Sequence, residues 1–265
     1  MSRRIQNVTL SVLSVVLLIA LYAYLSHRQH KKNPDDTTIP TAKQLWEGIK
    51  KAVAADPDSG ERWIAVDSKA TASRLFLGLG VGVLGSIVIG LLMGSFHPVE
   101  AFMGPPLRLL AKVPPTAALA VFFVMVGTDT EMYVAMIAFG ILPTLAQSVY
   151  LAVRDVPSQN ADKALTLGGS RAEILYEVVF KQIRPKIIDA IRLQIGPAMV
   201  YLIAAEMVCS DQGFGYRIRL QSRLLEMNVV YPYIALLAGF GFLMDAILKG
   251  VIRIWCPWYS PQEIR

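Results

Sequence analysis

The chain has little charge, cysteine or histidine. Asp, Glu, Lys and Arg make up only 17% of its 265 residues, whereas soluble domains usually carry about a quarter. We expect its two cysteines, Cys209 and Cys256, near the ends of two successive membrane spans and on opposite faces of the membrane, which excludes a disulfide between them. His27 and His30 form an H-x-x-H pair with no third ligand nearby, so we expect no metal site.

Further absences narrow the function. The sequence has no G-x-x-x-x-G-K-[ST] phosphate loop, so this chain is not expected to hydrolyse ATP by that mechanism. No histidine falls inside an expected span, which argues against a membrane-embedded enzyme, and we expect no catalytic residue. No motif for reading nucleic acid is present, and the net charge of +6 comes from basic residues scattered between apolar segments. We therefore expect no nucleic-acid partner.

Long uncharged runs dominate what is present. The hydrophobic share is 54% and the mean hydropathy is +0.46. Runs of about 20 apolar residues are long enough to cross a bilayer. We predict an all-α polytopic membrane protein with six transmembrane helices, at residues 8–26, 75–96, 113–126, 132–153, 193–209 and 229–252.

Small residues and prolines mark three of these spans. The second span carries Gly78, Gly82, Gly90 and Gly94, which form two small-xxx-small pairs and predict close helix packing. Pro114 and Pro115 predict a helix start or a kink in the third span, and Pro143 is expected to interrupt the fourth.

Lysine and arginine set the expected orientation. The short loop 127–131 has none, whereas residues 153–192 hold Arg154, Lys163, Arg171, Lys181, Arg184, Lys186 and Arg192. The positive-inside rule places the second segment in the cytoplasm, and counting spans puts both termini there as well. Arg28, Lys31 and Lys32 run against this rule, because they would then lie outside.

The spans divide the chain into four parts. Residues 1–32 are expected to be an anchor helix, and 33–74 an extracytoplasmic segment with amphipathic helices. One of these helices places Leu45, Trp46, Ile49 and Val53 on one face, which predicts a helix lying on the membrane surface or on the bundle, and 56–61 reads as a turn. Residues 75–252 are expected to form a five-helix core that includes the loop 157–185, and 253–265 a cytoplasmic tail.

The segment 161–185 is polar and carries clear signals for the start and the end of helices, although apolar spans flank it. Asn160 or Ser158 is expected to cap a short helix whose first turn carries Asp162. Gly168 and Gly169 are expected to end that helix, since glycine adopts the left-handed cap conformation without steric cost.

A second helix is expected directly after the glycines. Ser170 and Glu173 fit the S-x-x-E capping box, Glu177 and Lys181 are spaced for an ion pair, and Pro185 is expected to end or bend the helix. Two short helices would then meet at a rigid corner. Such a shape suits docking into a cleft on another protein.

The pattern Asp162-Lys163-Ala164-x3-Gly168, followed by Pro185, resembles the EAA loop of ABC importer permeases. The resemblance extends over about 190 residues. Four further segments of the chain resemble the nitrate/sulfonate/taurine/bicarbonate branch of these permeases, at 72–94, 109–127, 138–156 and 202–216. This chain departs from the family's usual Glu-Ala-Ala at Asp162–Ala164, and Lys181 stands where a proline is common.

The resemblance implies both a role and partners. The loop would be a cytoplasmic coupling helix gripped by an ATPase, through Asp162, Lys163, Ala164, Leu167, Gly168, Gly169, Ser170, Glu173 and Pro185. It further implies two ABC ATPase subunits that bind ATP and Mg²⁺, a second permease copy in a homodimer, a periplasmic solute-binding protein and a place in the bacterial inner membrane. No cofactor is expected on this chain.

The sequence signals for residues of the translocation path are weaker than those for the loop. Thr116, Gln194, Tyr201 and Glu206 are the candidates, and Glu206 is read equally well as a helix-end carboxylate that faces water. Asp245 and Lys249 predict an ion pair.

The solute is left open by the sequence. The resemblance implies a small anion such as a sulfonate, taurine or nitrate, but no Arg or Lys cluster within a span marks an anion site. The alternatives are a permease of the same family for a non-anionic molecule such as a thiamine precursor, and a membrane scaffold without transport activity.

Overall fold

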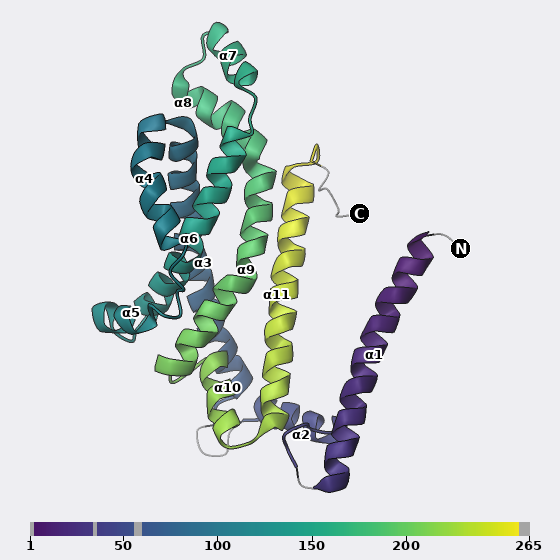
Figure 1. The fold of residues 1–265 in the computed structure, drawn as a ribbon. Helices are drawn as coiled ribbons and strands as arrows, with labels where there is room; N and C mark the ends of the chain where they lie inside the picture. The colour runs from purple at the N-terminus through teal and green to yellow at the C-terminus, as the bar shows by residue number, and fades with distance from the viewer. Residues whose placement is uncertain (1–2, 34–35, 56–59, 260–265) are drawn as a thin grey trace. The chain divides into compact units, whose positions relative to one another are not determined.

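The structure is a computed structural model that describes residues 3–33, 36–55 and 60–259. Within these residues the regular elements are all helical, which confirms the predicted all-α class, and Ala55 and Arg62 form an isolated bridge (Figure 1). The chain divides into two compact units. One comprises residues 1–66 and 217–236, and the other comprises 67–216 and 237–265.

The described residues form a series of helices. In chain order they are α1 (Arg3–Lys32), α2 (Ala42–Val53), α3 (Trp63–Ser95), α4 (His97–Leu110), α5 (Leu119–Val126), α6 (Thr130–Arg154), α7 (Ser158–Thr166), α8 (Arg171–Glu173), the π-helix η1 (Ile174–Phe180), α9 (Lys181–Cys209), α10 (Phe214–Arg223) and α11 (Met227–Trp255).

Five helical segments of the described chain are long and apolar enough to cross a membrane. They lie in α1, α3, α6, the continuous run from α8 through η1 to α9, and α11. Five of the six expected spans therefore have a matching helix.

The expected third span, 113–126, has a different structure. Only α5 is helical there, and its eight residues extend about 12 Å, well short of the roughly 30 Å of a bilayer core. Residues 111–118 form turns that contain Pro114 and Pro115, which have no N–H to donate to a helix. Helix α4 was also not predicted, and it contains Pro105 and Pro106.

The second span begins earlier than expected. Helix α3 starts at Trp63, so residues 63–74 of the expected extracytoplasmic segment are helical and continuous with the span. Asp67 and Thr71 are buried in this first part of α3. Their polar groups have partners, described below, so the helix continues through them.

The glycines of α3 allow close packing against α6, as the small-xxx-small pairs predict. A Cβ atom built on Gly82 would lie 2.6 Å from the Ile141 side chain, and one on Gly90 would lie 2.6 Å from Val149. Gly78 and Gly94 face Ile137 and Val153 in the same way. A regular spacing of four residues on both helices thus forms one continuous contact.

The core of the second unit is built from α3, α6 and α9. Its largest cluster of buried apolar residues comprises Leu75, Leu79, Met132, Tyr133, Met136, Ile137, Ile141, Ala198, Leu202 and Ala205. Helix α6 packs along α9, as Figure 1 shows. Pro143 does not interrupt α6, contrary to expectation, and it is buried within the continuous helix.

In the first unit, α2 forms as predicted but packs through a different face. Thr41 and Gln44 make a capping box at its start. The packed face carries Gly48 and Ala52, and a Cβ atom on Gly48 would lie 2.0 Å from the carbonyl oxygen of Asn228. Trp46, Ile49 and Val53, on the predicted apolar face, are exposed and do not pack on the bundle, which leaves the membrane surface as the predicted place of that face. Of the expected turn at 56–61, residues 56–59 lie outside the described chain.

The histidine pair of α1 belongs to the same unit. His30 lies within hydrogen-bonding distance of the Ser26 carbonyl oxygen, at 2.9 Å, and of the Gln44 side chain, at 3.1 Å. The ring therefore helps to join α1 to the start of α2.

Candidate functional site

The predicted corner is present and is closed by backbone hydrogen bonds. Gly168 has φ of +86°, in the left-handed region. Its N–H donates to the Leu165 carbonyl at 2.9 Å, and the Gly169 N–H donates to the Ala164 carbonyl at 3.0 Å. This pair of bonds is the Schellman motif, which satisfies the last carbonyls of α7 and fixes the direction in which the chain leaves the helix.

The second helix starts immediately, with the predicted capping box. The Glu173 N–H donates to Ser170 Oγ at 3.2 Å, and the Ser170 N–H donates to Glu173 Oε2 at 2.8 Å. A helix-ending motif and a helix-starting motif therefore share one short connection, Leu167–Ser170. The chain has little freedom to bend there, because both caps fix backbone dihedrals.

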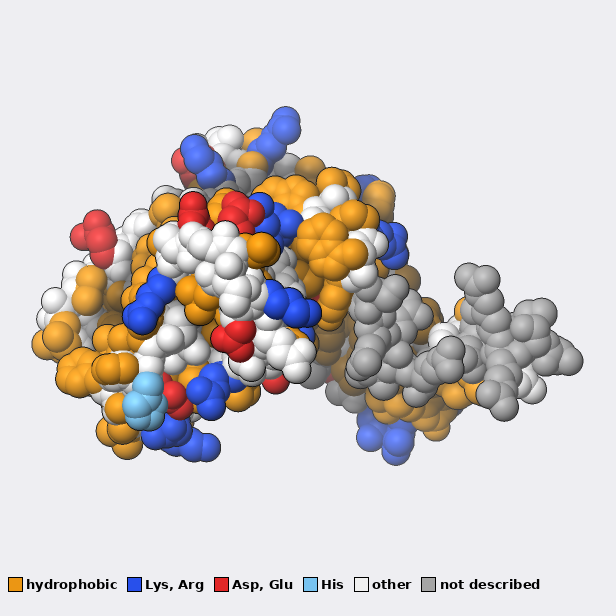
Figure 2. All heavy atoms as spheres, turned by 90° about the horizontal axis from the view of Figure 1, so that it is seen from above, with side chains coloured by type: hydrophobic (Ala, Val, Ile, Leu, Met, Phe, Trp, Pro, Cys, Tyr) orange, Lys and Arg blue, Asp and Glu red, His pale blue; other side chains and the backbone are white. Residues whose placement is uncertain are grey.

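The outer side of the corner is exposed. Asp162 and Lys163 are exposed on α7, and Leu167 is the most exposed leucine of the described chain, at 88%. Figure 2 looks onto this end of the molecule and shows Lys, Arg, Asp and Glu side chains interspersed on it. The exposed side of the corner thus combines an apolar side chain with charges of both signs.

The start of α7 differs from the prediction. Neither Asn160 nor Ser158 caps the helix, because the N-cap position is Pro157, without a side-chain hydrogen bond, and Ser158 is already helical. Asn160 instead donates from Nδ2 to Gln182 Oε1 at 3.3 Å, and so joins α7 to α9.

The corner continues into a membrane span without a break. Residues 171–209 form one helical run of 39 residues through α8, η1 and α9. Pro185 was expected to end or bend the second helix, but it lies buried inside α9, and the helix continues past it. The predicted Glu177–Lys181 ion pair is present, and Lys186 Nζ contacts Asp155 at the end of α6 at 2.9 Å.

A charged cluster joins α9 to the last helix. Arg192 Nε lies 2.8 Å from Asp245, which also binds Lys249 at 2.8 Å, so the predicted Asp245–Lys249 pair is confirmed and extended. Asp189 binds Arg192 and accepts a hydrogen bond of 3.1 Å from Tyr259. Burial, followed by the bond to Asp189, raises the pKa of the Tyr259 phenol.

The expected path residues occupy separate places. Thr116 is exposed in the turns before α5. Gln194 accepts a hydrogen bond of 3.3 Å from Thr144 on α6, and the Tyr201 ring lies against Gly140 of the same helix. Gln194 and Tyr201 thus both contact α6 across the α6–α9 packing.

Glu206 does not face water, because its side chain is fully buried. Arg74 Nη1 lies 3.0 Å from Glu206 Oε1, Thr71 Oγ1 lies 3.0 Å from both carboxylate oxygens, and the Gly215 N–H donates to Oε2 at 2.9 Å. Each carboxylate oxygen therefore has at least two polar partners, as a buried charge requires.

The same polar cluster ties the loop after α9 to α3. Asp67 accepts a hydrogen bond from the Gly213 N–H, and Thr71 accepts one from the Phe214 N–H, both at 2.9 Å. The Arg74 guanidinium donates to the Gln212 carbonyl at 2.9 Å, and its carbon lies 4.1 Å from the centre of the Tyr133 ring. Gly213 has φ of +111°, and a Cβ atom there would lie 2.5 Å from Glu206.

The sequence held a signal for this cluster. Asp67, Thr71 and Arg74 recur at i, i+4 and i+7, which is one face of a helix. The prediction places these residues in the extracytoplasmic segment 33–74, apart from the second span, and so does not identify their common face.

Five helices long and apolar enough to cross a membrane, together with an exposed corner closed by a cap on each side, fit the class of polytopic membrane proteins. The family described as "Binding-protein-dependent transport system inner membrane component" matches residues 83–253. This range covers the corner and the spans on both sides of it.

Individual relatives agree with the family match. The taurine transport system permease protein TauC of Escherichia coli K12 is 29% identical over 194 residues, 73% of this chain and 70% of that protein. A putative aliphatic sulfonates transport permease protein, SsuC of Bacillus subtilis 168, is 26% identical over 86% of this chain and 80% of its own length. The nitrate import permease protein NrtB of Synechocystis sp. PCC 6803 is 20% identical over 76% and 74%.

A solved structure shares the fold. The MetNI methionine ABC transporter, in an inward-facing conformation, contains a chain that superposes with a TM-score of 0.64 at 13% identity and covers 82% of this chain and 99% of that one.

The chain belongs to the family of binding-protein-dependent transport system inner membrane components. It is a multi-pass permease subunit of an ABC importer, hence a transport component and not an enzyme, and ATP hydrolysis takes place in a separate subunit. The predicted class of protein is confirmed.

Replacing Arg74 by Met tests the buried cluster. The change leaves the Glu206 carboxylate buried without its cation, and we expect a loss of about 3–5 kcal/mol in the free energy of unfolding. Lys51→Met is the control, since Lys51 and Glu226 form an exposed ion pair worth about 0–1 kcal/mol. Denaturant unfolding of both variants in detergent measures the difference. Equal losses would show that Glu206 does not depend on Arg74.

Proposed function

We propose that the corner between α7 and α8 is the coupling element of the importer, where a separate ATPase subunit grips this chain. The observation that carries the proposal is the pairing of the Schellman motif with the capping box across Leu167–Ser170. A flexible loop would absorb the motion of an ATPase, whereas a corner fixed at both sides transmits it.

Different residues of the corner would contact the ATPase and hold the corner rigid. Asp162, Lys163 and Leu167 are exposed and would contact the ATPase. Gly168, Gly169 and Ala164 hold the helix end through their backbone, and Ser170 and Glu173 hold the next helix start. Pro185 lies within α9 and would act only through the course of that helix.

Motion at the corner would reach the bundle through α9. The helical run from Arg171 to Cys209 is continuous, and α9 packs along α6 in the core. The Asp155–Lys186 pair would hold the end of α6 to α9, and the Arg192–Asp245 pair would carry the displacement to α11.

The orientation proposed for the chain places this corner in the cytoplasm. Residues 153–192 carry seven lysines and arginines, and the loop 127–131 carries none. Both termini would then be cytoplasmic. Two ATPase subunits with bound ATP and Mg²⁺ would serve two copies of this chain in a homodimer, and a periplasmic binding protein would deliver the solute.

The solute proposed is a small anion of the sulfonate, taurine or nitrate kind. This proposal is supported by the relatives named for taurine, aliphatic sulfonates and nitrate. A non-anionic solute such as a thiamine precursor is the alternative, because Arg74 and Arg192, two basic residues within the spans, are each paired with a carboxylate.

Exchanging both Gly168 and Gly169 for valine tests the coupling role. Valine at Gly168 would need a left-handed backbone, which costs roughly 1–2 kcal/mol, and a Cβ atom at Gly169 would lie 3.0 Å from the Ala164 carbonyl oxygen. We expect the double variant to insert normally but to lose the co-purifying ATPase and uptake.

Gly196→Val is the matched control, because a Cβ atom there meets no neighbour. It should keep both the ATPase and uptake. A double variant at Gly168 and Gly169 that retained them would remove the coupling assignment.

Solute-stimulated ATP turnover tests the proposed substrate class. The purified complex with its binding protein should hydrolyse ATP faster with taurine, an alkanesulfonate or nitrate than with a thiamine precursor. Stimulation by the thiamine precursor alone would replace the anion by the alternative solute.

A further inference from the structure

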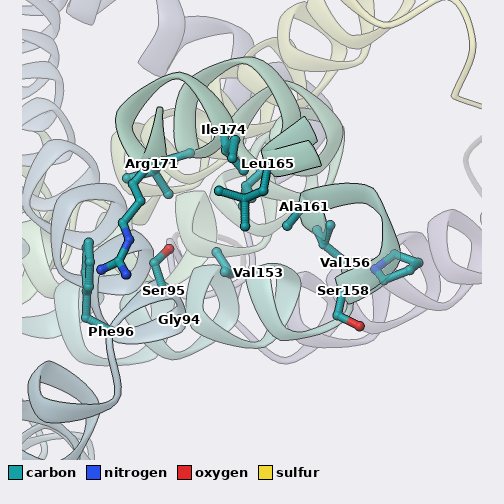
Figure 3. A pocket seen from close by; sticks show the side chains of 13 residues that line it. Gly94, Ser95, Phe96, Val153, Val156, Ser158, Ala161, Leu165, Arg171 and Ile174 are labelled. Carbon is teal, nitrogen blue, oxygen red and sulfur yellow. The ribbon is translucent and has the colours of Figure 1, made fainter. Parts of the chain in front are cut away.

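A cavity lies between the corner and the ends of two membrane spans. Its volume is about 320 Å³, at the lower end of pockets that hold small ligands. The end of α3 and the end of α6 line one side, with Gly94, Ser95 and Val153, and α7, α8 and η1 line the other (Figure 3).

The lining combines apolar side chains with a single positive charge. Val153, Leu165, Leu175 and Val179 are among the apolar residues, and Arg171 is the only charged residue of the lining. In Figure 3 the Arg171 side chain extends from α8 toward Ser95 and Phe96. Within the described chain, no carboxylate lies within ion-pairing distance of this guanidinium. The cavity thus favours a ligand that is both anionic and apolar.

The position of the cavity adds a second constraint. Helices α3 and α6 are both long enough to cross a membrane, and they end at Ser95 and Arg154. The residues of the cavity floor, Gly94, Ser95 and Val153, lie in the last turns of these two helices. The ends of membrane-spanning helices are expected near the lipid head groups.

We propose that the cavity binds an anionic phospholipid from the leaflet on the corner side of the membrane. The lipid phosphate would take the charge-assisted hydrogen bonds of Arg171, and Ser95 would donate its hydroxyl. The first methylenes of an acyl chain would lie over Val153 and Val179, and the part of the lipid that enters the cavity would replace its water.

A segment of the ATPase is a less suitable occupant. Helix α7 turns Ala161 and Leu165 into the cavity, whereas Asp162 and Lys163 do not line it. The exposed tip of the corner, Leu167, does not line it either. The surface proposed for the ATPase and the surface of the cavity therefore use different residues of α7.

A bound lipid would support the coupling corner on the side that faces the ends of the spans. It would fill the space between α7 and the ends of α3 and α6, so that α7 could not move toward the spans independently of them. This consequence rests on the proposed coupling function, whereas lipid binding itself does not.

Photo-crosslinking in nanodiscs tests the binding. The complete transporter with its ATPase is reconstituted in phosphatidylcholine, with a trace of photoactivatable phosphatidylglycerol or of photoactivatable phosphatidylcholine. We expect the anionic probe to label peptides that contain Val153, Leu165 and Val179 more strongly than the zwitterionic probe. Arg171→Gln should lower this labelling about fivefold, the factor for one basic residue at an anionic lipid surface.

Two further variants make the result unambiguous. Arg253→Gln removes an exposed arginine outside the cavity and should leave the labelling unchanged. Ala161→Trp fills the cavity while keeping Arg171, and it should abolish the labelling. Equal labelling by both probes, or labelling that survives both Arg171→Gln and Ala161→Trp, would overturn the proposal. Labelling that appears only after the ATPase is removed would also overturn it, because a segment of the ATPase would then fill the cavity.

Discussion

Two backbone hydrogen bonds hold the corner on which the proposed coupling function depends. The N–H groups of Gly168 and Gly169 close the end of α7, and Ser170 opens the next helix in the following residue. Each motif is ordinary in itself, and each cap contributes about 1 kcal/mol. Their direct succession leaves no free linker, so the angle between α7 and the long helical run after it is fixed by the chain itself.

The packed core supports the corner through the helical run that follows it. The run from Arg171 to Cys209 packs along α6, and α6 in turn receives the glycine face of α3. At the far end, the buried Glu206 and its partner Arg74 hold the loop after α9 to α3. Both ends of α9 are thereby tied to the same packed helices, and a displacement at the corner has to move the helix as a body.

Most local sequence signals predicted the backbone correctly, although the expected cap at Asn160 or Ser158 did not form. Features that depend on tertiary partners were not predicted. Gly168, the Ser170–Glu173 box and the α3 glycines were readable because their effect lies in the backbone or in a fixed spacing. The continuation of α9 through Pro185 was not, because a proline is tolerated where neighbouring helices pack around it. Glu206 was misread for the same reason: its partners, Thr71 and Arg74, are more than 130 residues away in sequence.

Cross-linking at the corner tests the central claim most directly. A single cysteine at Leu167, in a chain without Cys209 and Cys256, lies at the exposed tip of the corner and leaves the Ser170–Glu173 capping box intact. In the purified complex, a short thiol cross-linker should join this cysteine to the ATPase subunit, and ATP-driven uptake should fall when the link forms. A complex that hydrolyses ATP and transports solute while this cysteine reaches no ATPase residue would contradict the account.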